Sequence, residues 1–166
     1  MNAKSIHSPK EIMLVAHDIR SAHNVGSFFR TADAAGFSHI HISGYTPRPI
    51  DRFGRTQSDI AKTALGGELS VQWSESKEII PLLVDLKEKG FYLIALEQDE
   101  RSIDYKSVSV EDKNKVAFIV GNEVTGIDKE VLDLCDCIAV IPQKGVKESL
   151  NVSVAFGVGV FRILGL

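Results

Sequence analysis

Four polar or glycine-rich segments, far apart along the chain, carry most of the residue types that could do chemistry. Each follows an apolar run directly and holds amides, carboxylates, hydroxyls or glycines that can bind and orient a polar ligand. In a parallel α/β sheet, ligands bind beyond the carboxyl ends of the strands, so segments placed in this way are predicted to line one pocket. The segments are HDIRSAHNVGSFFR (17–30), LEQDE (96–100), GNEVTG (121–126) and PQKGVKESLN (142–151).

Two glycine patterns test whether the pocket takes a phosphate-bearing nucleotide. Gly121 and Gly126 have the spacing of a P-loop, but Ile127 and Asp128 follow where Lys and Ser/Thr are required. The run GVGVFR has Arg162 in place of the third glycine of a dinucleotide fingerprint. The missing fingerprint disfavours a small α/β enzyme that uses a nicotinamide or a flavin. Acidic groups without a phosphate-binding cation favour a cofactor that carries positive charge.

The sequence favours neither a metal site nor a hydrolase nucleophile. His39 and His41 share one face of a predicted strand, but no third ligand has a natural position beside them, so we expect no metal. Cys135 and Cys137 do not form a CxxC pair and fit two reduced thiols in a cytoplasmic protein. Ser149 lacks the GxSxG context of a hydrolase nucleophile.

One basic stretch stands out in a chain of net charge −3, YTPRPIDRFGR (45–55). An acidic balance argues mildly against a large nucleic-acid footprint, yet local clustering of cations matters more for such contacts. Here arginines alternate with aromatic rings, a combination that suits phosphate contact and base stacking. The alternative is a solvated loop. The candidate RNA-binding residues are Arg48, Arg52, Arg55 and the nearby Lys62.

Apolar β-rich runs alternate with helical patterns along the chain, which predicts an α/β fold with a mostly parallel sheet. The length of 166 residues suits a single domain over 1–166. We expect no membrane span and no signal peptide, because the long apolar runs that they need are missing. Predicted strands cover 11–19, 39–43, 69–74, 91–96, 115–120 and 137–142. Predicted helices cover 24–36, 59–66, 76–90, 128–135 and the segment after 149, with Pro81 as a kink or part of a late first turn.

Three segments together resemble the signature motifs of the TrmH-type SPOUT methyltransferases: NVGSFFRTADAAGF, FIVGNEVTGI and IPQKGVKESLNVSVAFGVGVF. The stretch KTALGGE is similar to one between the family's first two motifs. The resemblance implies methyl transfer from S-adenosylmethionine to a ribose 2′-hydroxyl of tRNA or rRNA. It also implies a C-terminal deep trefoil knot and a homodimer with active sites at its interface. TrmH-type enzymes often carry extra helices or a separate RNA-binding domain, so here the dimer's own surface is expected to hold the RNA.

The resemblance also implies roles for individual residues. Arg30 matches the family's catalytic arginine, and a guanidinium keeps its proton above about pH 12. We therefore expect Arg30 to bind a substrate phosphate and stabilise a developing alkoxide. Asn24 and Ser149 would orient these groups, and Glu123 would fix the arginine or take the proton. The implied catalytic set is Asn24, Arg30, Glu123, Ser149 and Asn151, and the implied cofactor-binding set is Leu96, Gly121, Asn122, Ile141, Ser149, Leu150 and Asn151.

The final helical segment contains Gly157 and Gly159, although glycine inside a helix costs about 0.5–1 kcal/mol relative to alanine. Threading of this helix through a knot would offset that cost by close backbone approach; the alternative is an ordinary capped core helix. An alternative function also stays open, that of a non-catalytic RNA-binding or ribosome-associated protein that retains the fold.

Overall fold

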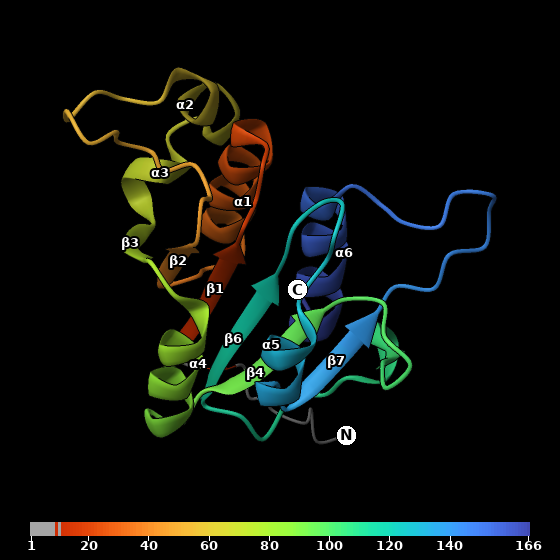
Figure 1. The fold of residues 1–166 in the computed structure, drawn as a ribbon. Helices are drawn as coiled ribbons and strands as arrows, with labels where there is room; N and C mark the ends of the chain where they lie inside the picture. The colour runs from red at the N-terminus through yellow and green to blue at the C-terminus, as the bar shows by residue number, and fades with distance from the viewer. Residues whose placement is uncertain (1–8, 10) are drawn as a thin grey trace, which may run out of the picture.

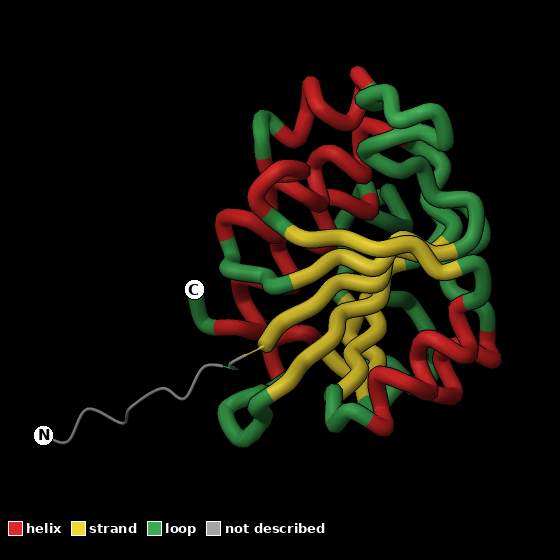
Figure 2. The backbone as a smooth tube through the Cα atoms, turned by 90° about the vertical axis from the view of Figure 1, so that its left-hand side faces the viewer, coloured by secondary structure: helices red, strands yellow, loops and turns green. Residues whose placement is uncertain are grey.

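The computed structural model describes residue 9 and residues 11–166, which form one seven-stranded sheet between two layers of helices (Figures 1 and 2). The strand order is β3-β2-β1-β6-β4-β7-β5, and every paired neighbour in it runs parallel. Because all strands point the same way, their carboxyl ends share one edge of the sheet. The strands are β1 Glu11–His17, β2 His39–Ser43, β3 Gln72–Ser76, β4 Tyr92–Leu96, β5 Ile103–Asp104, β6 Lys115–Val120 and β7 Cys137–Val140.

The helices divide between the two faces of the sheet. One apolar cluster joins α1 (Ala22–Ala34), α2 (Ser58–Ala64) and α6 (Val152–Leu164) to one face. The other cluster joins α4 (Ile79–Glu88) and α5 (Lys129–Leu134) to the opposite face. Alternation along the strands produces this division, since Leu14 and Ala16 belong to the first cluster and Val15 to the second. Two short elements complete the chain, α3 (Gly67–Ser70) and the 3₁₀ turn η1 (Tyr105–Ser107).

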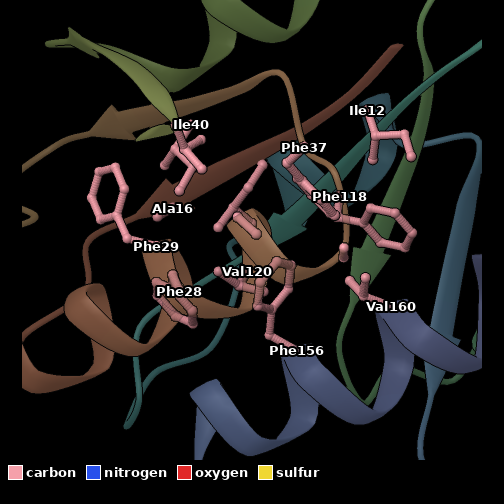
Figure 3. Packing of buried hydrophobic residues seen from close by; sticks show 14 of the residues in the cluster. Ile12, Ala16, Phe28, Phe29, Phe37, Ile40, Phe118, Val120, Phe156 and Val160 are labelled. Atoms are coloured by element: carbon pink, nitrogen blue, oxygen red, sulfur yellow. The ribbon is translucent and has the colours of Figure 1, made fainter. Parts of the chain in front are cut away.

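Aromatic rings join α1 to α6 over the sheet (Figure 3). Phe156 of α6 meets Phe28 of α1 edge-on at 5.4 Å between ring centroids, and meets Phe37 at 5.6 Å. Phe37 in turn lies 5.9 Å from Phe118 of β6. Edge-to-face rings at these distances are favourable beyond their buried area. Helices α1 and α6, which both begin at the carboxyl edge of the sheet, are therefore fixed against each other.

The predicted α/β class and parallel sheet are confirmed, with local differences. Leu69 and Ser70 lie in α3, so the strand expected from 69 begins at Gln72, and β5 and η1 were not predicted. Such short elements have too few residues for a periodic pattern. Pro81 is the third residue of α4, within the first turn, where no backbone N–H has an intrahelical partner, so it forms no kink there.

The two glycines of α6 differ in their surroundings. A Cβ on Gly159 would lie 3.2 Å from both methyl carbons of Leu96, whereas the nearest atom to one on Gly157 is Thr31 Cγ2 at 3.9 Å. Gly159 is therefore closely packed, but against the Leu96 side chain rather than against a backbone. The expected close backbone approach is wrong for Gly157. Among the described residues, no helix has both the length and the apolar character to cross a membrane.

Candidate active site

Four polar residues from three of the predicted segments meet at the carboxyl edge of the sheet. We call Ser21, Asn24, Glu123 and Asn151 the polar clasp. Ser21 caps the N-terminus of α1, and its hydroxyl accepts a hydrogen bond from the backbone N–H of Asn24. Glu123 follows β6, and Asn151 caps α6. The clasp therefore joins residues separated by 127 positions in sequence.

Hydrogen bonds connect the clasp in a continuous chain. The Asn24 amide nitrogen donates to Glu123 Oε1 at 2.8 Å, and its amide oxygen accepts from Asn151 Nδ2 at 3.1 Å. Asn151 Oδ1 accepts from the backbone N–H groups of Ser153 and Val154, which is the ordinary N-cap arrangement. Asn24 is 8% exposed, so both ends of its amide need partners, and the clasp provides them.

Glu123 is held as an ionised acceptor. Burial raises the pKa of its carboxyl, but hydrogen bonds from the backbone of Arg20, the Asn24 amide and the backbone of Ser21 outweigh that effect, and the net pKa lies below its usual value. The Arg20 and Ser21 bonds measure 2.9 and 3.1 Å. A carboxylate at the N-terminus of α1 also complements the helix dipole. With its lowered pKa and three donors, Glu123 is a poor proton acceptor at neutral pH.

Asn122 organises the loop that presents Glu123. Its amide oxygen accepts from the backbone N–H groups of Val124 and Thr125, while its amide nitrogen donates to the Asp18 carbonyl at 2.9 Å and to the Tyr45 hydroxyl at 2.6 Å. Gly121 precedes it because no side chain fits there: a Cβ would lie 2.8 Å from the Gly126 carbonyl oxygen. The GNEVTG segment is thus a tight, self-braced turn.

A cavity of about 580 Å³ opens beside this turn. That volume lies in the range of small-molecule and cofactor sites. All seven residues expected to bind the cofactor line it, namely Leu96, Gly121, Asn122, Ile141, Ser149, Leu150 and Asn151. Its described lining contains the carboxylates Glu97, Glu123 and Glu148 but no Lys or Arg side chain. The electrostatics therefore favour a cationic ligand over a phosphate.

Sequence reasoning missed one residue that shapes the cavity. Glu97 follows β4, and its Oε2 accepts from the Ile127 backbone N–H at 2.9 Å, which ties the end of β4 to the GNEVTG turn. The neighbouring Gln98 side chain donates to the Glu148 carbonyl and so joins the same strand end to the loop before α6. The signal was present, since the LEQDE segment directly follows a predicted strand.

Two residues of the expected catalytic set lie outside the clasp. Ser149 lines the cavity, and its hydroxyl has no hydrogen-bond partner among the described residues. Arg30 is exposed on α1, does not line this cavity, and forms no ion pair with any residue the structure describes. The single chain therefore brings Asn24, Glu123, Ser149 and Asn151 together, whereas no hydrogen bond or ion pair within the described residues joins Arg30 to them.

The expected RNA-binding stretch, residues 45–55, forms an exposed loop that we call the arginine loop. It borders a hollow of about 630 Å³ next to the ends of β2 and β3. Arg48 pairs with Glu75, and Arg55 Nε donates to Asp51 Oδ2 at 2.8 Å. Arg52 lies 4.7 Å from the centre of the Phe53 ring and forms no ion pair within the described chain. Lys62 is exposed on α2 nearby in sequence.

The histidines and cysteines do not form a ligand cluster in the part of the chain that is described, where no three His, Cys, Asp or Glu side chains are placed to hold a metal. His39 Nε2 and His41 Nδ1 both contact the Ser74 hydroxyl, at 2.8 and 3.0 Å. Cys135 and Cys137 are free thiols.

The chain is similar to known RNA methyltransferases over nearly all of its length. The model of the SpoU rRNA Methylase family matches residues 11–161. A 23S rRNA (guanosine-2′-O-)-methyltransferase of Ralstonia nicotianae is 31% identical over 91% of this chain and 57% of its own length. A tRNA (guanosine(18)-2′-O)-methyltransferase of Aquifex aeolicus is 27% identical over 90% of this chain and 66% of its own length. The chain thus spans about three fifths of these relatives.

Solved structures show the same fold. An AdoMet-bound rRNA methyltransferase from Sinorhizobium meliloti superposes with a TM-score of 0.83 at 25% identity, over 95% of this chain and 57% of that one. The TrmH/SpoU tRNA modifying enzyme of Aquifex aeolicus superposes with a TM-score of 0.80 at 24% identity, over 96% of this chain and 76% of that one.

Proposed function

The chain belongs to the SpoU rRNA Methylase family, and on that premise we propose that it transfers a methyl group from S-adenosylmethionine to a ribose 2′-hydroxyl of tRNA or rRNA. One observation carries the proposal: the clasp unites three distant segments at the mouth of a cavity that is rich in carboxylates and lined by no described cation. The two relatives named above are guanosine 2′-O-methyltransferases of 23S rRNA and of tRNA.

The lining of the cavity fits S-adenosylmethionine. Leu96, Ile141 and Leu150 offer apolar surface for an adenine ring, and the strand ends offer backbone groups for its polar edge. The carboxylates suit a ligand with positive charge at sulfur and at its amino group. When bound, this cofactor supplies an electrophilic methyl on a sulfonium, a reaction for which alignment of the reacting atoms matters most.

The clasp acts in this proposal by positioning. Glu123 stays ionised, fixes the start of α1 and orients Asn24, rather than taking the proton of the hydroxyl. Asn151 bonds to Asn24 and caps α6, and so fixes the start of α6 relative to α1. Ser149 lines the cavity, its hydroxyl has no hydrogen-bond partner among the described residues, and in this proposal it donates to or accepts from the ribose.

Arg30 is proposed to bind a substrate phosphate bidentately and to stabilise the developing alkoxide. Its exposure and its lack of an ion-pair partner among the described residues leave the guanidinium available. Arg30→Lys keeps the charge but loses the fork. Methyl transfer by that variant should fall by about two orders of magnitude, the scale of losing one preorganised donor. Near-normal transfer would rule out the clamp.

We also propose a homodimer that pairs through α6. Val154, Val158 and Phe161 recur at helical spacing and are 49%, 41% and 38% exposed, so they form an apolar stripe without a described cover. Thr31, next to Arg30 on α1, is the nearest neighbour of Gly157 on α6. A second copy over the stripe would therefore lie beside Arg30 and help to complete the site.

A C-terminal trefoil knot and a single cytoplasmic methyltransferase domain over 1–166 belong to the same proposal. Three separate stretches, after β4, after β6 and between β7 and α6, line one cavity, and a chain that passed through its own loop here would bring such stretches together. Knots are rare, so family membership is the main support.

The decisive experiment combines calorimetry with S-adenosylmethionine and transfer of labelled methyl to total RNA. We expect saturable cofactor binding and labelled 2′-O-methylated nucleosides after digestion. RNA binding without cofactor binding or transfer would instead support the alternative, a non-catalytic RNA-binding or ribosome-associated protein that retains the fold.

A further inference from the structure

Tyr45, the first residue of the arginine loop, is fixed at its backbone and at its hydroxyl. Its backbone N–H donates to Asp18 Oδ1 at 3.1 Å, and its hydroxyl accepts from Asn122 Nδ2 at 2.6 Å. The following residue, Thr46, is buried, and its hydroxyl accepts from the Ile19 backbone N–H at 3.0 Å. These contacts hold the phenol in one place at the ends of β2, β1 and β6.

The ring of Tyr45 nevertheless remains open to solvent, with the residue 61% exposed. The hydrogen bond accounts for the hydroxyl, because the second amide hydrogen of the buried Asn122 needs an acceptor. It does not account for the ring, since a water molecule would satisfy the same amide. Ordered aromatic surface left in water is the feature that base-stacking sites use.

A second ring on the loop, Phe53, is as exposed as Tyr45 but differs in its contacts. Phe53 is 65% exposed, but the guanidinium carbons of Arg52 and Arg55 lie 4.7 and 5.1 Å from its ring centre. Its side chain has no polar atom that could fix it. Phe53 is therefore partly covered by its own loop, whereas Tyr45 is anchored.

Tyr45 also stands between the two hollows of this edge. It lines the hollow of the arginine loop, while Asn122, its hydrogen-bond partner, lines the cavity of the clasp. The sheet order β2-β1-β6 explains this placement, because the end of β1 alone separates the two strand ends. A base on the Tyr45 ring would belong to the reacting nucleotide or to its immediate neighbour.

We propose that Tyr45 is a stacking platform for an unpaired base of the RNA substrate, placed by Asn122 at the entrance of the methyl-transfer cavity. The proposal rests on the proposed function for the identity of the cavity, and it narrows the substrate class. A base can cover an aromatic ring in this way when it is unstacked from its neighbours, so the substrate site is a loop, bulge or single strand rather than a duplex.

Three variants separate the ring from its anchor. Tyr45→Leu removes the ring, Tyr45→Phe keeps the ring and removes the hydroxyl, and Phe53→Leu removes the other exposed ring. Binding of a fluorescein-labelled, mixed-sequence single-stranded RNA is measured by anisotropy, with the matching duplex as a control. Thermal unfolding and calorimetry with S-adenosylmethionine check that each variant keeps its fold and its cofactor site.

We expect Tyr45→Leu to weaken single-strand binding by about 5- to 150-fold, the range for one base–aromatic stack. Tyr45→Phe should stay within about threefold of the wild type, since stacking needs the ring. Phe53→Leu should cost less than Tyr45→Leu. In transfer assays, Tyr45→Leu should raise KM for RNA more than it lowers kcat. A 4-thiouridine oligonucleotide should crosslink to the peptide that contains Tyr45.

Unchanged binding by Tyr45→Leu, an equal loss in Tyr45→Phe, or a larger loss in Phe53→Leu would each overturn the proposal. Tight duplex binding with no preference for single strands would do the same. Failure of the wild type to bind S-adenosylmethionine would defeat the proposed function instead, and the anisotropy series would still decide the role of Tyr45.

Discussion

The polar clasp and the arginine loop both lie at the carboxyl edge of the sheet, but they use their polar groups differently. In the clasp, side chains from three distant segments bond to one another, and Asn24 is 8% exposed. In the arginine loop, Asp51 accepts from the Phe53 and Arg55 backbones and from the Arg55 side chain, all within five residues. The clasp holds distant segments together, whereas the turn around Asp51 is held by its own residues.

This difference separates polar residues that fix distant segments to one another from polar residues that stabilise only their own turn. The clasp depends on the parallel sheet, because only that topology brings the starts of α1 and α6 to the end of β6. The turn around Asp51 would keep its internal bonds with little help from the sheet, whereas Tyr45, Thr46 and Arg48 at the start of the loop are bonded to strands or to the residues that follow them. Damage to the clasp should therefore spread through the site, and damage to the loop should stay local.

Breaking the clasp should give the largest effect. Asn24→Ala leaves Glu123 and Asn151 without their shared partner, so methyl transfer should fall by about 100-fold, the scale of a small misplacement of reacting groups. The free energy of unfolding should also fall by about 1–3 kcal/mol, since the two hydrogen bonds of the buried Asn24 amide are lost. Initial rates and urea unfolding measure both.

Asp51→Asn is the matched change in the loop. It should leave urea unfolding within about 1 kcal/mol of the wild type, because exposed ion pairs contribute little. Equal losses in the two variants would show that the contrast between clasp and loop is mistaken.

Neutralising the loop arginines should give an intermediate effect on RNA binding. Arg48 and Arg55 already have carboxylate partners, whereas Arg52 has none among the described residues, so Arg52→Gln should weaken binding more than the Arg48→Gln, Arg55→Gln double variant. The slope of log Kd against log salt should drop by about 0.7 for each RNA phosphate that the variant no longer neutralises. An unchanged slope when all three are replaced would mean that the loop does not bind the RNA.

Acid should loosen the clasp slightly. The pKa of Glu123 is lowered in the folded protein, so its contribution to stability is fully present above the ordinary value of 4.5 and is lost as the pH falls through the lowered folded pKa. The difference in unfolding free energy between the wild type and Glu123→Gln should therefore shrink below pH 4.5. Urea titrations at neutral and acidic pH measure it, and a constant difference would contradict the assignment.

Most strands, the long helices and the chemistry of the pocket were predictable from the sequence. Apolar runs such as KVAFIV (115–120) predict strands by their composition alone, and the polar segments that directly follow them are visible in the same way. Asn24, Glu123 and Asn151 were predicted to lie together because their segments match a family pattern, and hydrogen bonds join them in the structure. The roles of Glu97 and Tyr45 were not predictable, since their partners Ile127 and Asn122 lie 30 and 77 residues away.

The sequence by itself determined the alternation of strands and helices, the polar ends of those strands and the caps of α1 and α6, because these depend on neighbours within a few residues. The tertiary structure alone decided that Asn24 bonds to both Glu123 and Asn151, that Arg48 pairs with Glu75, and that the ring of Tyr45 stays open. The physical reason is that a hydrogen bond or an ion pair forms between whichever groups the packed sheet places within about 3 Å, and no pattern along the chain records that distance.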